Sequence, residues 1–387
     1  MSEKPIVIFW FRRDLRLHDN AGLYHALRSG FKVLPIFIFD TTILNKLEDK
    51  DDKRVLFIHR EIQKLNSILQ EDHKSRLKVY HDAPLQVFKE LISQYSIDTV
   101  YCNRDYEPAA INRDKEIYSF LKERGIALKG YKDQVIFDRN EVMKDDGTPY
   151  TVYTPYMRKW KSLLNDFYLR SYPSLKYGDQ FLPMEPESVP ELKKLGFEDG
   201  DFDFPSREFD EEIIGNYHHT RDIPSIKGTS RLSLHLRFGT ISIRKLARVA
   251  AIINEKYFNE LIWRDFYQMI LYHFPHTVNE AFRPAYDHIK WENNESYFDK
   301  WCKGLTGFPL VDAGMRELST TGFMHNRVRM LVASFLTKHL LIDWRWGELW
   351  FARKLLDYEQ ASNVGGWQWA AGSGVDAAPY LIPIINM

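Results

Sequence analysis

The chain has 387 residues, of which 44% are hydrophobic and 14% aromatic, enough to bury cores in two or three domains. Basic and acidic residues both number 53, so global charge indicates no nucleic-acid partner, and any DNA binding needs a local basic surface. Two cysteines exclude a disulfide framework and a cysteine-rich zinc site. With no apolar run long enough for a membrane span and a charged segment after the first strand, we expect a cytoplasmic protein.

The first 131 residues alternate short apolar runs with amphipathic stretches. Runs of strand length lie at residues 5–10, 32–39, 77–80, 99–102 and 126–128. Helical spacing is found at residues 20–28, 53–69, 85–95 and 109–123. The alternation predicts a doubly wound α/β domain, whose parallel sheet is covered on both faces and binds a ligand at the carboxyl ends of its strands. This part of the sequence has no glycine-rich phosphate-binding motif, so no nucleotide ligand is predicted from such a motif.

Residues 132–205 are rich in proline and glycine and are typical of a long connector over the surface. Within it, Thr154 is predicted to cap a helix that has Pro155 in its first turn. After residue 205 the strand pattern ends, and an all-α domain is expected over residues 206–387. Its predicted helices cover residues 208–217, 242–253, 256–273, 325–341 and 347–356.

Eight of the ten tryptophans lie between residues 260 and 369, which by itself is typical of a large aromatic core. Four motifs point further: Trp10-Phe-Arg-Arg-Asp-Leu-Arg16, Leu261-Ile-Trp-Arg-Asp-Phe266, Gly322-Phe-Met-His-Asn-Arg-Val-Arg-Met330 and Gly365-Gly-Trp-Gln-Trp-Ala-Ala371. In this order they resemble the DNA photolyase and cryptochrome family. The resemblance implies an antenna-type α/β domain followed by a helical FAD-binding catalytic domain.

The segment Gly228-Thr-Ser-Arg-Leu-Ser233 places hydroxyls and free N–H groups ahead of a predicted helix. Such groups suit an anion, although plain helix capping is the common alternative. The resemblance implies that this segment binds the FAD diphosphate, and that Glu359 stands where relatives have aspartate. The implied cofactor-binding residues are Tyr217, Thr229, Ser230, Arg231, Leu232, Ser233, Arg264, Arg329, Asp357, Glu359 and Asn363.

Glu260 and Arg264 share one helix face beside Trp263, which favours the rim of a pocket over a solvated ion pair. The resemblance implies that Glu260 contacts a damaged pyrimidine and that Trp263 forms a wall against it. Asparagine and methionine four residues apart on the next helix are typical of cyclobutane-dimer photolyases rather than of 6–4 photolyases or plant cryptochromes. The implied catalytic residues are Glu260, Trp263, Asn326, Met330 and Trp369.

Three tryptophans, Trp291, Trp344 and Trp367, match the family's electron-transfer chain, although ordinary packing explains them equally well without the resemblance. Arg221 and Arg327 match positions that contact DNA phosphates. A basic cluster at residues 158–161, beside Tyr156 and Trp160, is either a further phosphate contact or a solvated face.

The implied function is light-driven repair of cyclobutane pyrimidine dimers in DNA by electron transfer from excited reduced FAD, performed by a monomer without a metal. A cryptochrome-like blue-light receptor is the alternative. An inactive remnant is a third interpretation, because the chain ends early for the family and Tyr380-Leu-Ile-Pro departs from its motif. The identity of an antenna chromophore, of folate or deazaflavin type, stays open: Glu107 fits a folate site, whereas Thr277-Val278 replaces a Cys-Lys pair of folate-binding relatives.

Overall fold

The computed structural model describes residues 4–375, so the Tyr380 motif lies outside the described residues. Five parallel strands form one sheet in the order β3-β2-β1-β4-β5. Because β1 pairs with both β2 and β4, the chain winds outward from the centre of the sheet in both directions, as predicted. The strands are β1 (Ile6–Phe11), β2 (Lys32–Asp40), β3 (Lys78–Asp82), β4 (Ile97–Asn103) and β5 (Ala127–Tyr131).

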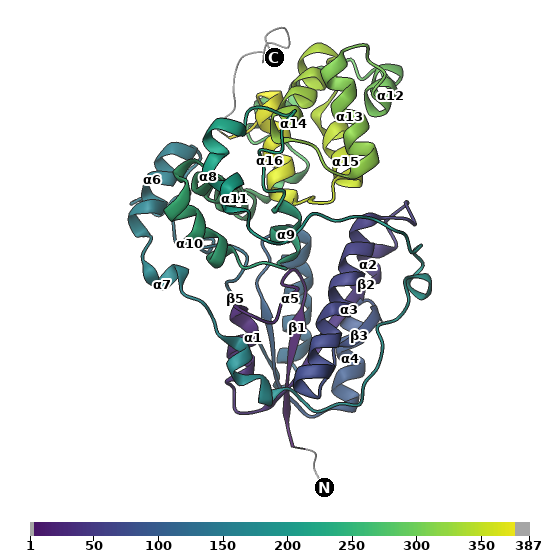
Figure 1. The fold of residues 1–387 in the computed structure, drawn as a ribbon, viewed down its shortest axis with the longest axis vertical. Coiled ribbons are helices and arrows are strands. Elements are labelled where there is room, and N and C mark those ends of the chain that lie inside the picture. Colours follow the sequence, from purple (N-terminus) through teal and green to yellow (C-terminus); the bar gives the residue numbers. More distant parts are fainter. Residues whose placement is uncertain (1–3, 376–387) are drawn as a thin grey trace.

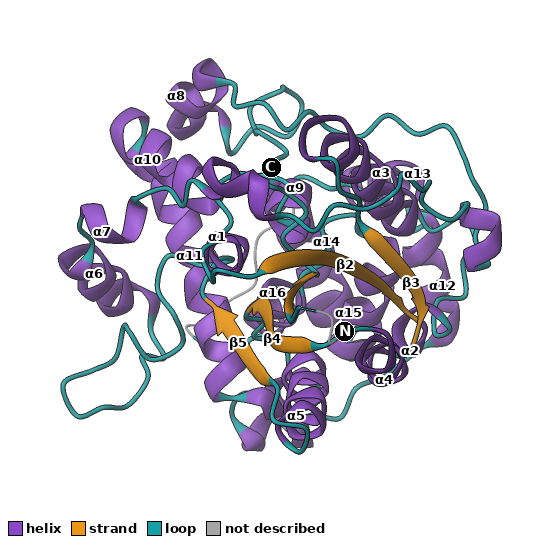
Figure 2. Cartoon of the chain, turned by 90° about the horizontal axis from the view of Figure 1, so that it is seen from below, coloured by secondary structure: helices purple, strands orange, loops and turns teal. Residues whose placement is uncertain are grey.

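Side chains along β1 alternate between two hydrophobic cores, which is why this strand is apolar at every position. Phe9 and Phe11 pack in one core with α1 (Ala21–Leu27) and α3 (Lys53–His73). Ile8 and Trp10 pack in the other with α4 (Pro84–Gln94) and α5 (Pro108–Lys122). Figure 2 shows these two helix pairs on opposite faces of the sheet, and the short α2 (Thr41–Leu44) follows β2.

The connector, residues 132–205, was predicted to lie over the surface, but several of its side chains are buried in the hydrophobic cores. Helix α6 (Tyr153–Leu163) follows Val152 as N-cap, so the predicted cap at Thr154 is wrong. No side chain caps α6. The helix is instead stabilised by Tyr156 and Trp160, which are buried in the core of the helical part. Farther along, Phe181 and Leu192 pack against α3. The other elements here are α7 (Asp166–Leu169), η1 (Ser174–Gln180) and η2 (Leu192–Leu195).

Beyond residue 205 the described chain forms helices and loops, in agreement with the all-α prediction. The helix predicted after the 228–233 segment is α9 (Ser233–Phe238), and three helices were not predicted: α12 (Glu295–Lys303), α13 (Pro309–Thr321) and α16 (Gln360–Ala371). The predicted helix 325–341 is shorter, because α14 (Asn326–Ser334) passes into a π-helical turn, Phe335–His339. The other elements are α8 (Glu211–Thr220), α10 (Ile243–Ile253), α11 (Glu255–His273), η3 (Pro275–Val278), η4 (Pro284–His288) and α15 (Trp344–Lys354).

The helical part packs on the carboxyl end of β1, above the sheet in Figure 1. Asp133 accepts hydrogen bonds from Arg16 (2.7 Å) and Arg244 (2.8 Å), and Arg244 also donates to Asp19 (3.0 Å), all in buried positions. Gly239 allows this close approach, because a Cβ there would lie 2.2 Å from the Arg13 carbonyl oxygen. These contacts fill the carboxyl end of β1, where the sequence predicted part of a ligand crevice.

Across residues 4–375, every helix is too short or too polar to cross a lipid bilayer.

Candidate active site

A cavity of about 570 Å³ lies within the helical part, a volume typical of cofactor sites. Its walls come from the end of α8, the 228–237 segment, α11, α14 and α16, which are distant in sequence. All the predicted catalytic, cofactor-binding and DNA-binding residues line this one cavity, together with Trp367. Of the predicted site residues, Trp291 and Trp344 do not line it.

The cavity wall carries an excess of positive charge. Six arginines and three carboxylates line it, so a diphosphate is better matched to this surface than a neutral ligand. His325 adds an unsatisfied donor. Its Nδ1 accepts the Arg327 backbone N–H (3.2 Å), which leaves the proton on Nε2, and this buried atom has no hydrogen-bond partner among the described residues. The lining therefore fits an anionic ligand with hydrogen-bond acceptors.

The hydroxyl-rich segment before α9 faces the cavity. The N-cap of α9 is Leu232, and no side chain caps this helix, so the plain-capping interpretation is wrong. Ser230 instead shares a hydrogen bond with Tyr257 of α11 (2.8 Å). Arg231 has a left-handed backbone (φ 52°) and lies 4.3 Å from the centre of the Phe323 ring. This backbone turn directs the segment along the cavity wall.

The charges on α11 have separate partners. Glu260 accepts a hydrogen bond from Arg221 (2.6 Å), and Arg264 donates to Glu359 (2.8 Å), so the two α11 residues do not form a surface pair with each other. Burial raises the pKa of Glu260, and the nearby charges of Arg221 and Arg327 offset only part of that rise. Glu260 is therefore a half-buried acid of the cavity lining, and we call the partly exposed section of the lining that it forms with Arg221 and Arg327 the mouth of the cavity.

Glu359 connects the cavity to the α/β part. One carboxylate oxygen accepts hydrogen bonds from both Arg264 and Arg13, each 2.8 Å long. Burial alone would raise the pKa of Glu359, but the charges of Arg264 and Arg13 outweigh it and hold the pKa below its usual range. Arg13 also pairs with Glu107 (3.0 Å), so the residue considered for a folate site takes part in this buried ion network.

A second pair, Arg329 and Asp357 (2.9 Å), fixes the loop before α16. At the start of α16, Asn363 donates to the carboxylate of Glu348 on α15 (2.9 Å), and Tyr358 donates to the same oxygen (3.4 Å). Burial raises the pKa of Glu348. Sequence reasoning missed Glu348, although a single acid among the aromatic residues of 344–351 was a usable signal.

Aromatic residues form one side of the cavity. Trp263 stacks face to face on Tyr153 of α6, with ring centres 3.5 Å apart, so the connector supports this wall. The ring centre of Trp367 lies 5.0 Å from that of Phe351 and 6.0 Å from that of the fully buried Trp301. Trp301 was not among the predicted site residues. Trp344 is buried in the same core, and Trp291 packs at its edge.

Two of the three cations in the basic cluster on α6 are paired with carboxylates, and the third, Arg158, is exposed. Lys159 pairs with Asp145 and Lys161 pairs with Glu255, while Tyr156 and Trp160 point into the core. This arrangement favours the solvated-face interpretation of the cluster.

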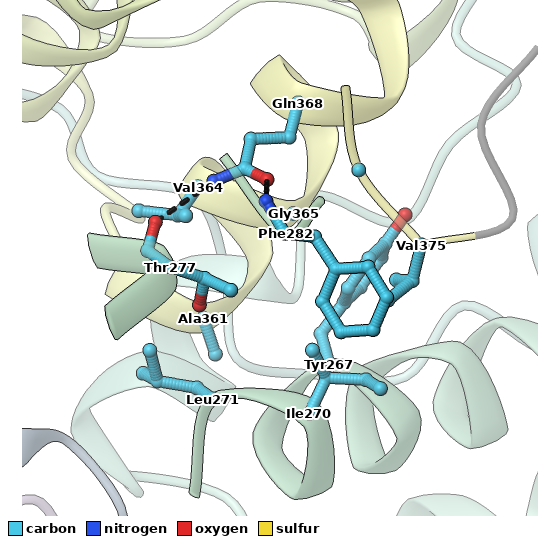
Figure 3. Close-up of a pocket in the computed structure, with 11 residues that line it drawn as sticks. Tyr267, Ile270, Leu271, Thr277, Phe282, Ala361, Val364, Gly365, Gln368 and Val375 are labelled. Atoms are coloured by element: carbon cyan, nitrogen blue, oxygen red, sulfur yellow. Dashed lines mark hydrogen bonds between the residues drawn. The ribbon is translucent and has the colours of Figure 1, made fainter. Parts of the chain in front are cut away.

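A second cavity, of about 10 Å³, lies behind α16 and holds at most a water molecule (Figure 3). Gln368 donates to the Thr277 carbonyl (2.8 Å) and accepts from the Phe282 N–H (2.9 Å). These bonds hold α16, with Trp367 and Trp369 on either side of Gln368, against the 277–282 segment. The Thr277 backbone therefore helps to fix the position of α16.

Asp265 is buried beneath the cavity, on α11. One of its oxygens accepts hydrogen bonds from the Ile136 N–H, the Phe137 N–H and the indole of Trp160, all 3.1–3.2 Å long. The other has no hydrogen-bond partner among the described residues. Burial raises the pKa of Asp265 from 3.8 to about 6. The folded chain thus binds more protons here than the unfolded chain between about pH 4 and pH 6.

A pH effect on stability follows. The proton bound by Asp265 stabilises the fold fully below about pH 4, and this contribution is lost as pH rises to about 6. Asp265→Asn removes the titration and keeps the shape. Relative to wild type, its free energy of unfolding should therefore improve by about 3 kcal/mol between pH 4 and pH 7. Urea unfolding at both pH values measures this, and a constant difference would contradict the raised pKa.

His, Cys, Asp and Glu side chains of the described residues form no cluster of three that could hold a metal ion.

Comparison with known proteins assigns the architecture. A family model of the FAD-binding domain of DNA photolyase matches residues 257–387, and a DNA photolyase model matches residues 7–175. A deoxyribodipyrimidine photo-lyase of Synechococcus sp. is 36% identical over 97% of this chain and 83% of its own length. A class III photolyase of Agrobacterium tumefaciens has a TM-score of 0.86 at 32% identity, covering 100% of this chain and 84% of that one. A Synechocystis cryptochrome has a TM-score of 0.82 at 28% identity, covering 98% and 85%.

An α/β part joined to a helical part with an arginine-lined cavity thus defines a flavoprotein of the photolyase and cryptochrome type. The chain belongs to the DNA photolyase family, a family of photo-lyase enzymes with an FAD-binding domain. The predicted family, fold class and cofactor are confirmed.

Proposed function

We propose that this protein repairs cyclobutane pyrimidine dimers in DNA by light-driven electron transfer from reduced FAD. The observation that carries the proposal is the single cavity that contains both the predicted flavin-binding residues and, at its mouth, Glu260, Trp263, Asn326 and Met330. Photo-lyase relatives that share about a third of their residues over most of the chain support the same chemistry.

The deeper wall would hold the cofactor. Thr229, Ser230 and Arg231 offer hydroxyl, backbone and guanidinium groups for its diphosphate, and the pair of Arg329 and Asp357 would flank its ring system. Asn363, oriented by Glu348, would present its amide to the ring. The bound flavin supplies a light-activated electron, while the protein positions the groups and keeps water away from them.

The mouth would hold the lesion. Trp263 and Trp369 line it with apolar rings that could pack against a flipped-out dimer. Glu260 would form a charged or neutral hydrogen bond with a pyrimidine, and Met330 would fill the remaining space with a polarisable group. Arg221 and Arg327 lie at the same mouth and would contact phosphates beside the flipped nucleotides.

The second candidate is a cryptochrome-like light receptor, which the similarity to the Synechocystis cryptochrome favours. Asn326 and Met330 support repair of cyclobutane dimers over this alternative, because they match the pattern of dimer photolyases. The monomeric state, the cytoplasmic location, the domain limits and a second chromophore remain predictions.

Repair of an oligonucleotide with one thymine dimer tests the proposal. Protein supplied with reduced FAD should restore the thymines under near-UV or blue light and should not do so in darkness. A sample that contains flavin but repairs nothing in the light would favour the receptor, and a sample that binds no flavin would favour an inactive remnant.

Photoreduction of the flavin tests the tryptophan chain. Trp344→Phe should slow reduction of oxidised FAD by light in the presence of an external reductant, because phenylalanine is much harder to oxidise than tryptophan. Absorbance during illumination measures the rate. Trp301→Phe is the matched variant, since Trp301 contacts Trp367 directly. An unchanged rate in Trp344→Phe would remove that residue from the path, and slowing in Trp301→Phe alone would assign the path to Trp301.

A further inference from the structure

The loop after α8 places a carboxylate between the two arginines at the cavity mouth. Asp222 accepts a hydrogen bond from the Arg327 Nε (2.5 Å), and the same oxygen lies 3.6 Å from the Arg221 Nε. Arg327 lies in the first turn of α14, 105 residues farther along the chain, so the contact joins two separate walls of the mouth. No sequence motif predicted this residue.

Asp222 and Glu260 together neutralise the mouth. Arg221 donates to Glu260 while it lies beside Asp222, and Arg327 pairs with Asp222, so two guanidinium charges face two carboxylates. The pair of arginines proposed to grip DNA therefore presents little net charge to an approaching strand. DNA phosphate has to replace an existing partner before either arginine can bind it.

The position of Asp222 is one that a phosphate oxygen could take. Guanidinium groups bind carboxylate and phosphate oxygens with the same N–H geometry and at similar distances. The side chain of Asp222 is 61% exposed, whereas those of Arg327 and Arg221 are 24% and 26% exposed. The carboxylate is thus the component of this cluster that can move into solvent, while the arginines stay beside the cavity.

Asp222 also carries its charge at neutral pH. Its partial burial would raise the pKa, but the hydrogen bond from Arg327 and the charges of Arg327 and Arg221 outweigh it and hold the pKa below its usual range. A competitor for phosphate needs this negative charge.

We propose that Asp222 occupies the phosphate position between Arg221 and Arg327 and acts as a built-in competitor that lowers the affinity of the protein for DNA. The proposal rests on the proposed function, because it assumes that these arginines contact phosphates. When DNA binds, its phosphates pair with the two arginines and Asp222 moves into solvent. There the free carboxylate takes up a counterion. Wild-type binding therefore releases fewer counterions than the two arginine contacts alone would release.

The experiment compares Asp222→Asn with wild type on a duplex with one thymine dimer and on the same duplex without it. Fluorescence anisotropy over a range of salt concentrations gives the affinity and its salt dependence. Asp222→Asn should bind both duplexes on the order of three- to tenfold more tightly, because Arg221 and Arg327 no longer have to be separated from a carboxylate before they bind phosphate. The slope of log affinity against log salt should become steeper by roughly one.

Two matched variants separate competition from general charge. Asp222→Glu keeps a carboxylate and should bind nearly as wild type does. Glu116→Gln removes an exposed charge from α5 of the α/β part and should leave both affinities unchanged. Equal tightening by Glu116→Gln would overturn the proposal, since net charge would explain the result.

The sign of the change decides between two roles. If Asp222 instead positions Arg327 for DNA, Asp222→Asn should weaken binding, and weaker or unchanged binding would overturn competition. Failure of the proposed function gives a different result: wild type would show no preference for the damaged duplex, while the undamaged duplex would still report on Asp222. Equal thermal stability and flavin content of the variants confirm that each is folded.

Discussion

Glu260→Gln is expected to retain its flavin and to repair a thymine dimer about 10- to 100-fold more slowly than wild type. Glutamine keeps the size of the side chain and an oxygen for Arg221 but loses the titratable carboxyl group. A hydrogen bond with a charged group contributes about 1.5–3 kcal/mol, which corresponds to this loss of rate if the bond matters most during ring opening. Single-turnover repair at saturating DNA and fixed light dose gives the rate.

Glu255→Gln is a suitable control because it lies on the same helix and its exposed carboxylate pairs only at the surface with Lys161. That variant should repair at the wild-type rate. Flavin absorbance of each sample shows whether cofactor was lost. Normal repair by Glu260→Gln would remove Glu260 from contact with the lesion, whatever its burial.

Asp133→Asn is expected to lower the free energy of unfolding by about 3–5 kcal/mol at pH 7. Asp133 is buried and accepts hydrogen bonds from Arg16 and Arg244, so the substitution leaves the buried Arg16 without its carboxylate partner and Arg244 with Asp19 alone. Urea unfolding, followed by tryptophan fluorescence, measures the change. Glu116→Gln, which removes an exposed carboxylate, should shift the free energy of unfolding by less than about 0.5 kcal/mol.

The pH dependence provides a second measurement. Burial acts to raise the pKa of Asp133, but the charges of Arg16 and Arg244 outweigh it and lower the pKa. The stabilisation by Asp133 is therefore present above about pH 4, the ordinary range of an aspartate, and is lost as pH falls through the lowered pKa. The difference between wild type and Asp133→Asn should shrink in strong acid. A difference that does not depend on pH would mean that packing, not charge, accounts for it.

The centre of the sheet was predictable because β1 is buried on both faces and is therefore apolar without interruption over residues 6–11, whereas the edge strands β3 and β5 are partly exposed. The helical part was harder. Helix α16 is buried on several sides and contains Gly365 and Gly366, so it lacks a polar face that spacing could reveal. Helix α13 did carry local signals, since it starts at Pro309 and ends before Gly322, and these were overlooked.

The candidate site was predicted by motif resemblance, and the structure brings its residues into one cavity. Spacing alone identified only neighbours on one helix, such as Glu260 and Arg264. It could not identify their partners, because Glu260 pairs with a residue 39 positions away and Arg264 with one 95 positions away. Asp222, Glu348 and Trp301 were missed for the same reason: their importance comes from contacts across space.

The bond between Arg13 and Glu359 spans 346 residues, and this separation has a consequence for synthesis on the ribosome. The sheet can form once residue 131 has left the ribosome, but Arg13 then lacks the partner that joins it to the helical part. Asp133 and Arg244 attach the helical part earlier, and Glu359 completes the attachment more than a hundred residues later. We expect nascent chains that stop before residue 359 to hold a folded sheet with its carboxyl end incompletely covered, and chaperones to act at that surface.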